Sequence, residues 1–283
     1  MKLACLLLSA LFLLGQSSPD TLNEAQIRDL IRKSADKDIE NTVRQRDYTF
    51  IQRNEQRKVD RKGNVTLESK TFEVLVLSGE PTQKLIAKDD KPLSEKEARN
   101  EEEKIQKLIA KYQKESEGER RKRLTKGEKD AEDERKFVRE IADAFRFKQT
   151  ATEMIDGRAN YVIDADPIPG YKPKVKDADI LPKVKFRAWI DKDDAQWTKL
   201  DVEAIDTISW GLFIARIQKG STMHFEQTRI NDEVWLPKHF SLKANAKVLL
   251  LKSLNLDWDV TFKDYKKFAT ATTIKPIGEV EEK

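Results

Sequence analysis

The chain has 283 residues, of which 54 are Lys or Arg and 50 are Asp or Glu, so its formal net charge is +4. A surface that is heavily charged but nearly balanced favours solubility and gives no global case for binding nucleic acid. The single cysteine, Cys5, excludes an intramolecular disulfide, so the fold has to rely on a buried core.

The first residues have the pattern of a secretory signal peptide. Lys2 precedes an apolar run over residues 3–14, and small or polar residues follow it. This run is too short to anchor the chain stably in a bilayer, and Cys5 lies inside it instead of behind it, where a lipid-attachment cysteine would stand. We therefore expect a signal peptide over residues 1–17, export, and a single mature domain over residues 18–283 without a transmembrane anchor.

A capped amphipathic helix is expected next. Thr21 and Glu24 have the spacing of a capping box, and apolar residues recur at helical spacing from Ile27 to Ala35. The pattern predicts a helix from residue 22 to about residue 37, with one stripe buried against another element.

Between residues 47 and 88 the period changes to two. Tyr48 and Phe50 share one face, and Phe72 begins a second alternating run beyond the turn signal at residues 62–64. The pattern predicts a long antiparallel hairpin, followed by a short strand over residues 83–88.

A helical insertion is expected over residues 94–146. A capping box at Ser94 and Glu97 begins it, one apolar stripe follows over residues 105–112, and Phe137, Ile141 and Phe145 form another. The charged stretch between the stripes has almost nothing to bury, which predicts two helices joined by a solvated segment. Its basic run, residues 120–123, is nearly neutralised by the acidic residues that follow, so a solvated surface and a contact with anionic lipid head groups both stay open.

After residue 147 the strands resume as a meander. Asp156-Gly157 predicts a tight hairpin turn, and the proline-rich residues 167–182 are incompatible with a central strand. Further strands are expected over residues 184–190, 197–204, 208–218, 221–230, 234–242, 248–256 and 260–265. Short connections force antiparallel pairing. The expected fold is α+β and mainly antiparallel, with about eleven strands in one curved sheet around helices.

No pattern in the sequence predicts a catalytic centre. His224 and His239 lie on neighbouring expected strands but lack a third metal ligand, which favours ordinary half-exposed residues. Asp191, Asp193 and Asp194 cluster where a turn is expected, and there Asp is favoured for hydrogen bonds to its own backbone. We expect a non-enzymatic protein with no catalytic residue, metal site or cofactor; a hydrolase with an unrecognised site is the weakest hypothesis.

The apolar face of the strands is the candidate ligand site. Two interpretations stay open: a core filled by the helices, or a pocket that methionine and aromatic side chains line adaptably. The predicted cavity lining is Tyr48, Phe50, Phe72, Trp210, Met223, Phe225, Leu236 and Phe240.

Three short motifs in order resemble the LolA/LolB-like lipoprotein-carrier superfamily. They are Trp-Ile-Asp at residues 189–191, Trp-Leu-Pro at residues 235–237, and Asp-Tyr-x-x-Phe at residues 264–268. Over most of the mature chain, the order of elements also resembles that of larger exported relatives of this superfamily, the outer-membrane lipoprotein-sorting proteins. The resemblance implies an unclosed half β-barrel of about eleven strands wrapped over helices, a cavity that shelters acyl chains, and a periplasmic location. The 94–146 insertion is longer than such a carrier needs, and the family's cavity-lid arginine has no identified counterpart here.

The leading hypothesis is an exported, periplasmic, non-enzymatic binding or carrier protein for a lipid or lipoprotein acyl chain. The alternative is an envelope protein-interaction or sensing module on the same fold, which presents the 94–146 helices to a protein partner. A fold by itself does not decide between them. Neither hypothesis involves nucleic acid.

Overall fold

A computed structural model describes residues 21–59, 64–175, 177–210, 215–248 and 252–268, so the expected signal peptide lies outside the described residues. The helices are α1 (Glu24–Gln45), α2 (Glu95–Gln113), α3 (Glu117–Ala144) and the short 3-10 helix η1 (Ala178–Lys183). The strands are β1 (Tyr48–Val59), β2 (Val65–Leu77), β3 (Glu80–Lys88), β4 (Lys91–Pro92), β5 (Phe145–Ile155), β6 (Arg158–Pro167), β7 (Val184–Asp191), β8 (Trp197–Ala204), β9 (Ile208–Trp210), β10 (Ala215–Ile217), β11 (Thr222–Ile230), β12 (Val234–Val248) and β13 (Lys252–Lys267).

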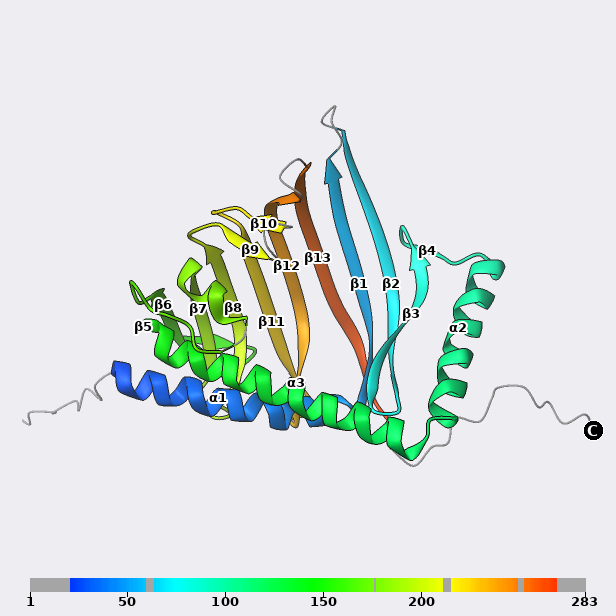
Figure 1. Cartoon of the computed structure of the whole chain (residues 1–283), viewed down its shortest axis with the longest axis horizontal. Coiled ribbons are helices and arrows are strands. Elements are labelled where there is room, and N and C mark those ends of the chain that lie inside the picture. The colour runs from blue at the N-terminus through cyan, green and yellow to red at the C-terminus, as the bar shows by residue number, and fades with distance from the viewer. Residues whose placement is uncertain (1–20, 60–63, 176, 211–214, 249–251, 269–283) are drawn as a thin grey trace, which may run out of the picture.

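All these strands belong to one sheet, in the order β4-β3-β2-β1-β13-β12-β11-β8-β7-β6-β5, with β10 and β9 attached beside β12. The pairings are antiparallel, and within the described residues the outer strands β4 and β5 do not pair with each other, so the sheet is open (Figure 1). This confirms the expected fold class, a mainly antiparallel unclosed sheet with helices. The expected strand over residues 208–218 is described only as β9 and β10, because residues 211–214 lie outside the described part.

The first helix is longer than the sequence pattern predicts. Its N-cap is Asn23, whose side chain accepts from the backbone N–H of Gln26 at 3.0 Å, so the capping box starts two residues after the expected one. The helix continues to Gln45 because a polar contact replaces the apolar stripe: buried Asn41 donates to the carbonyl oxygen of Trp235 at 2.8 Å. This contact fixes the end of α1 against the start of β12.

The charged stretch of the insertion is helical instead of an irregular link. Ser116 caps α3 and shares a reciprocal capping box with Glu119, and ion pairs one turn apart join Lys126 to Asp130 and Lys136 to Glu132. Such pairs and a composition rich in Glu, Lys and Arg favour a helix without any buried face. Consequently α3 is one continuous helix of 28 residues.

Helices α1 and α3 lie side by side across the lower part of the sheet in Figure 1, whereas α2 stands beside β3. The main core lies between these two helices and strands β5 to β8. Its most deeply buried members include Ile27, Ile31, Ala142, Phe145, Ile163, Ala188 and Ile190. The helices therefore cover the part of the sheet formed by β5 to β8.

One tight turn follows the sequence prediction, and a second joins β11 to β12. Asp156 and Gly157 join β5 to β6 with φ values of 48° and 79°, as the Asp-Gly pair predicts. Asn231 and Asp232, in the connection from β11 to β12, also have positive φ values, of 50° and 55°.

In the described part of the chain, no helix has the length and apolar character needed to cross a membrane.

Candidate functional site: an apolar cavity under helix α3

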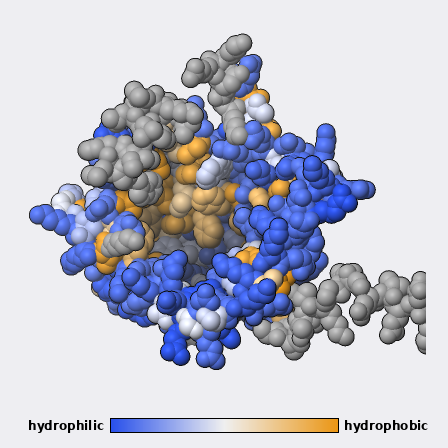
Figure 2. Space-filling model, turned by 45° about the vertical axis from the view of Figure 1, so that its right-hand side comes forward, coloured by the Kyte–Doolittle hydropathy of each residue, from blue (hydrophilic) through white to orange (hydrophobic). Residues whose placement is uncertain are grey.

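A cavity of about 450 Å³ lies between strands β7, β8 and β11 and the second half of α3, with η1 at one side. Its size lies within the range of roughly 300–1,000 Å³ that is usual for ligand pockets. Figure 2 shows a hollow whose interior is apolar and whose surroundings are hydrophilic. The cavity is lined by Asp38, Glu134, Phe137, Val138, Ile141, Phe145, Ile180, Leu181, Val184, Phe186, Trp197, Leu200, Val202, Ala204, Ile208, Ile217, Ser221, Thr222, Met223, Phe225, Gln227 and Leu242.

The sheet side of the cavity follows from strand alternation. On β11, Met223, Phe225 and Gln227 are two residues apart and therefore point to the same face. The register places Met223 opposite Val202 and Phe225 opposite Leu200 of β8. A continuous apolar floor results, because directly paired residues share a face of the sheet.

The helix side of the cavity comes from one stripe of α3. Phe137, Val138 and Ile141 line the space, and Phe137 and Ile141 are four residues apart on one helix face. The sequence pattern predicts the apolar stripe that contains these two residues. It does not predict which strands form the wall of the cavity opposite this stripe.

The structure brings only some of the predicted lining residues together. Met223 and Phe225 line the cavity, and Phe240 lies directly opposite Phe225 across the β11–β12 pair, on the same face. Of Trp210 the structure describes the backbone alone, paired with Ala215.

Phe50 and Phe72 lie farther along the same face. Phe50 packs against the rings of Phe262 and Tyr265, with centroid distances of 5.8 Å and 5.9 Å. Both Phe50 and Phe72 are half-buried. They belong to the β1–β2–β13 part of the sheet, outside the cavity lining.

Tyr48 and Leu236 lie in a separate small core. They are 1 % and 0 % exposed and pack with Val234. The Tyr48 hydroxyl donates to Glu233 Oε1 at 2.5 Å and accepts from Asn231 Nδ2 at 2.8 Å. This cluster supports the β11–β12 turn and does not line the cavity.

Two carboxyl groups face the cavity from the helices. Asp38 of α1 accepts a hydrogen bond of 2.8 Å from the buried Gln196, and Glu134 extends from α3. Burial raises the pKa of Asp38, with partial compensation from Gln196. Burial also raises the pKa of Glu134, and the nearby Asp38 charge adds to that increase. The apolar surroundings thus make both negative charges unfavourable.

These pKa shifts predict that Asp38→Asn stabilises the ligand-free protein at pH 7. The folded state holds the Asp38 pKa above its ordinary value of 3.8, so ionisation above that pH costs stability. The amide keeps an oxygen acceptor for Gln196 and removes the charge. Thermal unfolding should show a higher Tm for the variant at pH 7 and no difference below about pH 3.8, where the carboxyl group is protonated in both the folded and the unfolded state. Asp29→Asn, at an exposed carboxylate of the same helix, is the control and should leave Tm nearly unchanged.

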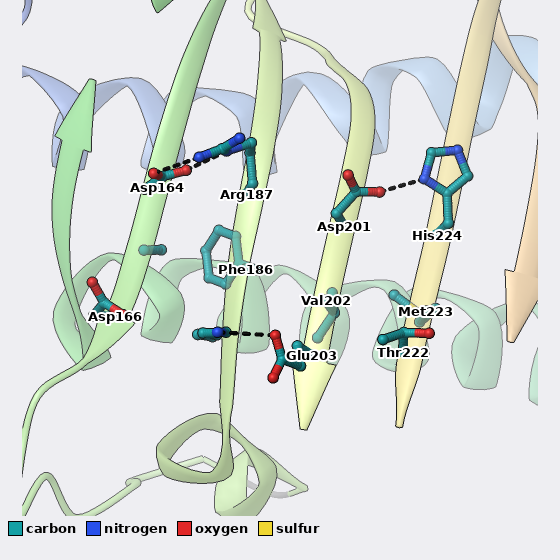
Figure 3. A pocket seen from close by; sticks show the side chains of 12 residues that line it. Asp164, Asp166, Phe186, Arg187, Asp201, Val202, Glu203, Thr222, Met223 and His224 are labelled. Carbon is teal, nitrogen blue, oxygen red and sulfur yellow. Dashed lines mark hydrogen bonds and ion pairs between the residues drawn. The ribbon is translucent and has the colours of Figure 1, made fainter. Parts of the chain in front are cut away.

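A second hollow lies on the opposite face of the sheet (Figure 3) and is lined largely by charged residues. Its side chains form cross-strand pairs: Arg187 with Asp164 at 2.8 Å, Lys185 with Glu203 at 2.9 Å, and His224 with Asp201. Cross-strand ion pairs of this kind account for the charge pattern without a ligand.

The histidines and the aspartate cluster have structural partners. His224 also contacts Glu226, and His239 contacts Asp259 at 2.8 Å. Asp191 Oδ1 accepts from the backbone N–H groups of residues 193 and 194 at 3.0 Å and 2.7 Å, which is the turn hydrogen bonding expected there. Among the described residues, no group of three or more His, Cys, Asp or Glu is arranged to hold a metal ion.

Sequence reasoning missed the polar members of the lining. Asp38 and Glu134 stand in segments dense with charge, where one carboxylate cannot be told from the next. The alternation on β11 was a usable signal for Gln227, because it places a polar residue in register with Met223 and Phe225.

The architecture is an open antiparallel sheet with helices on one face and an apolar cavity between them, which agrees with the unclosed sheet expected from the sequence. No protein-family model matches the sequence, and no curated protein matches it. Similar solved structures include an outer membrane lipoprotein-sorting protein domain from Vibrio parahaemolyticus (12 % identity, TM-score 0.34, 86 % of this chain and 95 % of that chain). Two others are a DUF1329 family protein from Desulfovibrio piger (10 %, 0.31, 87 % and 95 %) and a LolA superfamily protein from Nitrosomonas europaea (9 %, 0.28, 86 % and 93 %). With TM-scores below 0.5, these likenesses carry no argument about function.

Proposed function

We propose that this chain is an exported, periplasmic, non-enzymatic binding or carrier protein that shelters the acyl chain of a lipid or lipoprotein. The observation that carries the proposal is the apolar cavity of about 450 Å³ between α3 and the sheet. The signal-like residues 1–17 support the export.

The energetics of burial favour such a ligand. Each methylene group removed from water contributes about 0.8 kcal/mol, so a chain of about twelve methylenes gains on the order of 10 kcal/mol before the costs of association. Binding of this kind needs apolar area and shape, and it needs no catalytic group. The open side of the sheet allows entry and release without a covalent step.

The apolar face continues beyond the cavity and provides room for a longer chain. Leu242, which lines the cavity, pairs with Trp258 of β13, and Phe240 pairs with Val260. Trp258 is 41 % exposed, which is unusual for so large an apolar side chain. We propose that the end of a long acyl chain lies over these residues and reaches Phe50 and Phe72.

Native mass spectrometry of the protein purified from its own envelope tests this function. We expect a bound species that dissociates on activation and is identified as an acyl-chain lipid or a lipid-modified peptide. The stripped protein should also take up a neutral apolar fluorescent probe such as N-phenyl-1-naphthylamine. A ligand-free mass together with no probe uptake would contradict the proposal.

The alternative role in binding a protein partner stays a prediction. The first turns of α3 are exposed at residues 120–122, and Arg123 is tied to Glu115 at 2.9 Å and to the carbonyl oxygen of Ser78 at 3.1 Å. A rigid, charged helix end of this kind is a suitable surface for a partner of complementary charge.

A further inference from the structure

Three polar side chains of the cavity lining, Asp38, Glu134 and Gln227, belong to the end near α1. Asn41 and Gln45 of α1 each donate to the carbonyl oxygen of Trp235 at 2.8 Å, which places the β11–β12 turn against this helix. Gln227 lies three residues before the end of β11, and Asp38 lies about one helical turn before Asn41. The opposite end of the cavity, at Ile208, Ile217 and Leu242, is mainly apolar, with Ser221 and Thr222 at the start of β11 as its polar residues.

Gln227 provides an unused acceptor inside the cavity. Its side chain is 8 % exposed, and its Oε1 has no hydrogen-bond partner. Buried side-chain oxygens normally have a partner, so an orphaned oxygen in a ligand cavity indicates a group that the ligand completes. Ser221, in contrast, is satisfied within the chain, since its hydroxyl donates to the carbonyl oxygen of Gln218 at 2.7 Å.

The charged groups of the cavity have one sign. Asp38 and Glu134 line it, and none of the described lining residues is Lys, Arg or His. Neither carboxylate has an ion-pair partner among the described residues, although most charged side chains around them on α1 and α3 do, for example Asp36 with Arg139 at 2.7 Å. The cavity thus presents two carboxylates and an amide oxygen, all of them acceptors.

We propose that the cavity selects a single-chain amphiphile whose head group is a protonated amine, held by Asp38, Glu134 and Gln227 while its chain occupies the apolar space. This inference rests on the proposed function and narrows its ligand class. An ammonium group carries three donors and no acceptor, which complements the three oxygen-bearing side chains. A carboxylate or phosphate head would meet two like charges.

The unfavourable charges in the empty cavity are consistent with this ligand. Burial raises the pKa values of Asp38 and Glu134, and the hydrogen bond from Gln196 compensates Asp38 only in part. A charge that faces apolar surroundings without an ion-pair partner is unfavourable, and an incoming cation reduces that cost for both groups.

Competition between amphiphiles with the same chain tests the inference. Dodecylamine, lauric acid and dodecanol, each kept below its micelle concentration or its solubility limit, would displace N-phenyl-1-naphthylamine from the ligand-free protein at pH 7. We expect dodecylamine to act at a concentration at least about 10-fold lower than lauric acid, with dodecanol between them, since a hydrogen bond to a charged group contributes more than one between neutral groups.

Variants test whether the preference for dodecylamine over lauric acid depends on the three proposed head-group residues. Asp38→Asn combined with Glu134→Gln should abolish the preference for dodecylamine over lauric acid. Gln227→Met, which keeps the length of the side chain, should weaken dodecylamine and dodecanol binding about 10-fold. Glu128→Gln removes an exposed carboxylate of α3 that does not line the cavity, and it should behave like the wild type.

Two outcomes overturn the inference, and they differ from failure of the proposed function. If dodecylamine and lauric acid displace the probe equally, the inference fails but the proposed carrier function stands. The same holds if the preference for the amine persists in the double variant. Absence of binding by the probe and by all three amphiphiles overturns the carrier function, and this inference falls with it.

Discussion

Replacing Arg158 by alanine is expected to lower the free energy of unfolding by about 3–5 kcal/mol. The guanidinium group makes two parallel bonds to the Asp191 carboxylate, at 2.6 Å and 2.7 Å, and the Asp191 side chain is 0 % exposed. Without Arg158, a fully buried carboxylate would keep only the two backbone N–H groups of its own turn. Urea denaturation of the wild type and the variant at pH 7 measures the difference.

Arg187→Ala provides a matched control for this prediction. Arg187 also makes a two-point contact with an aspartate, Asp164, across the same β6–β7 strand pair. Both side chains are substantially exposed there, so the loss should be about 0–1 kcal/mol. If both variants lose a similar amount of unfolding free energy, the burial of Asp191 does not explain the contribution of the Arg158–Asp191 pair to stability.

The acid limb of the stability curve should depend on the same pair. Burial raises the pKa of Asp191. The hydrogen bonds and charge of Arg158, together with the N–H groups of the turn, lower it by more than burial raises it, so the net pKa is below the ordinary value of 3.8. A carboxyl group with a depressed folded-state pKa contributes stability above its unfolded pKa and loses it as the pH falls through the folded value. In Arg158→Ala the lowering by Arg158 is lost, so Asp191 has a higher pKa in the folded variant than in the folded wild type. The difference in stability should therefore begin to shrink as the pH falls through the variant's Asp191 pKa, and it should be smallest below the wild-type value.

Local signals predicted the strands well because their causes are local. The Asp156-Gly157 turn, the alternation on β11 and the short connections each depend on a few adjacent residues, and together they determine an antiparallel meander. The same reasoning predicted a solvated link for the charged part of the insertion, which is instead helical. A segment without an apolar stripe has no face to bury, but helix propensity, the Ser116 cap and ion pairs suffice to form a helix.

The site was less predictable because it depends on which elements meet. Alternation places Tyr48 and Leu236 among apolar strand residues, yet Tyr48 and Leu236 pack with Val234 near the β11–β12 turn. Nothing local distinguishes that small core from the cavity lining at Met223 and Phe225. Likewise, the Phe137–Ile141 stripe predicts a buried face of α3, and only the packing of the helix against the sheet reveals that the space beneath it is not filled.

Filling the cavity tests whether this space is where the ligand binds, and Val138→Trp is the most direct way to fill it. Val138 is on α3 and lines the cavity, so an indole group there enters space that the ligand would occupy. We expect uptake of N-phenyl-1-naphthylamine to fall at least about 10-fold, the loss that follows when about two methylene equivalents of burial are removed at about 0.8 kcal/mol each. Titration of the probe by fluorescence measures the loss.

The stability of the same variant separates a blocked cavity from a damaged fold. Inserting a large side chain into a packed core usually costs about 1–3 kcal/mol, but an empty cavity accepts it with less strain. Val138→Trp should therefore unfold at nearly the wild-type urea concentration, and Val43→Trp, at a 60 % exposed position of α1, should change neither uptake nor stability. If Val138→Trp leaves uptake intact, the ligand does not occupy the space under α3. The exposed apolar face at Trp258, Phe240 and Phe50 would then be its binding surface, and the cavity would be a packing defect of the helix.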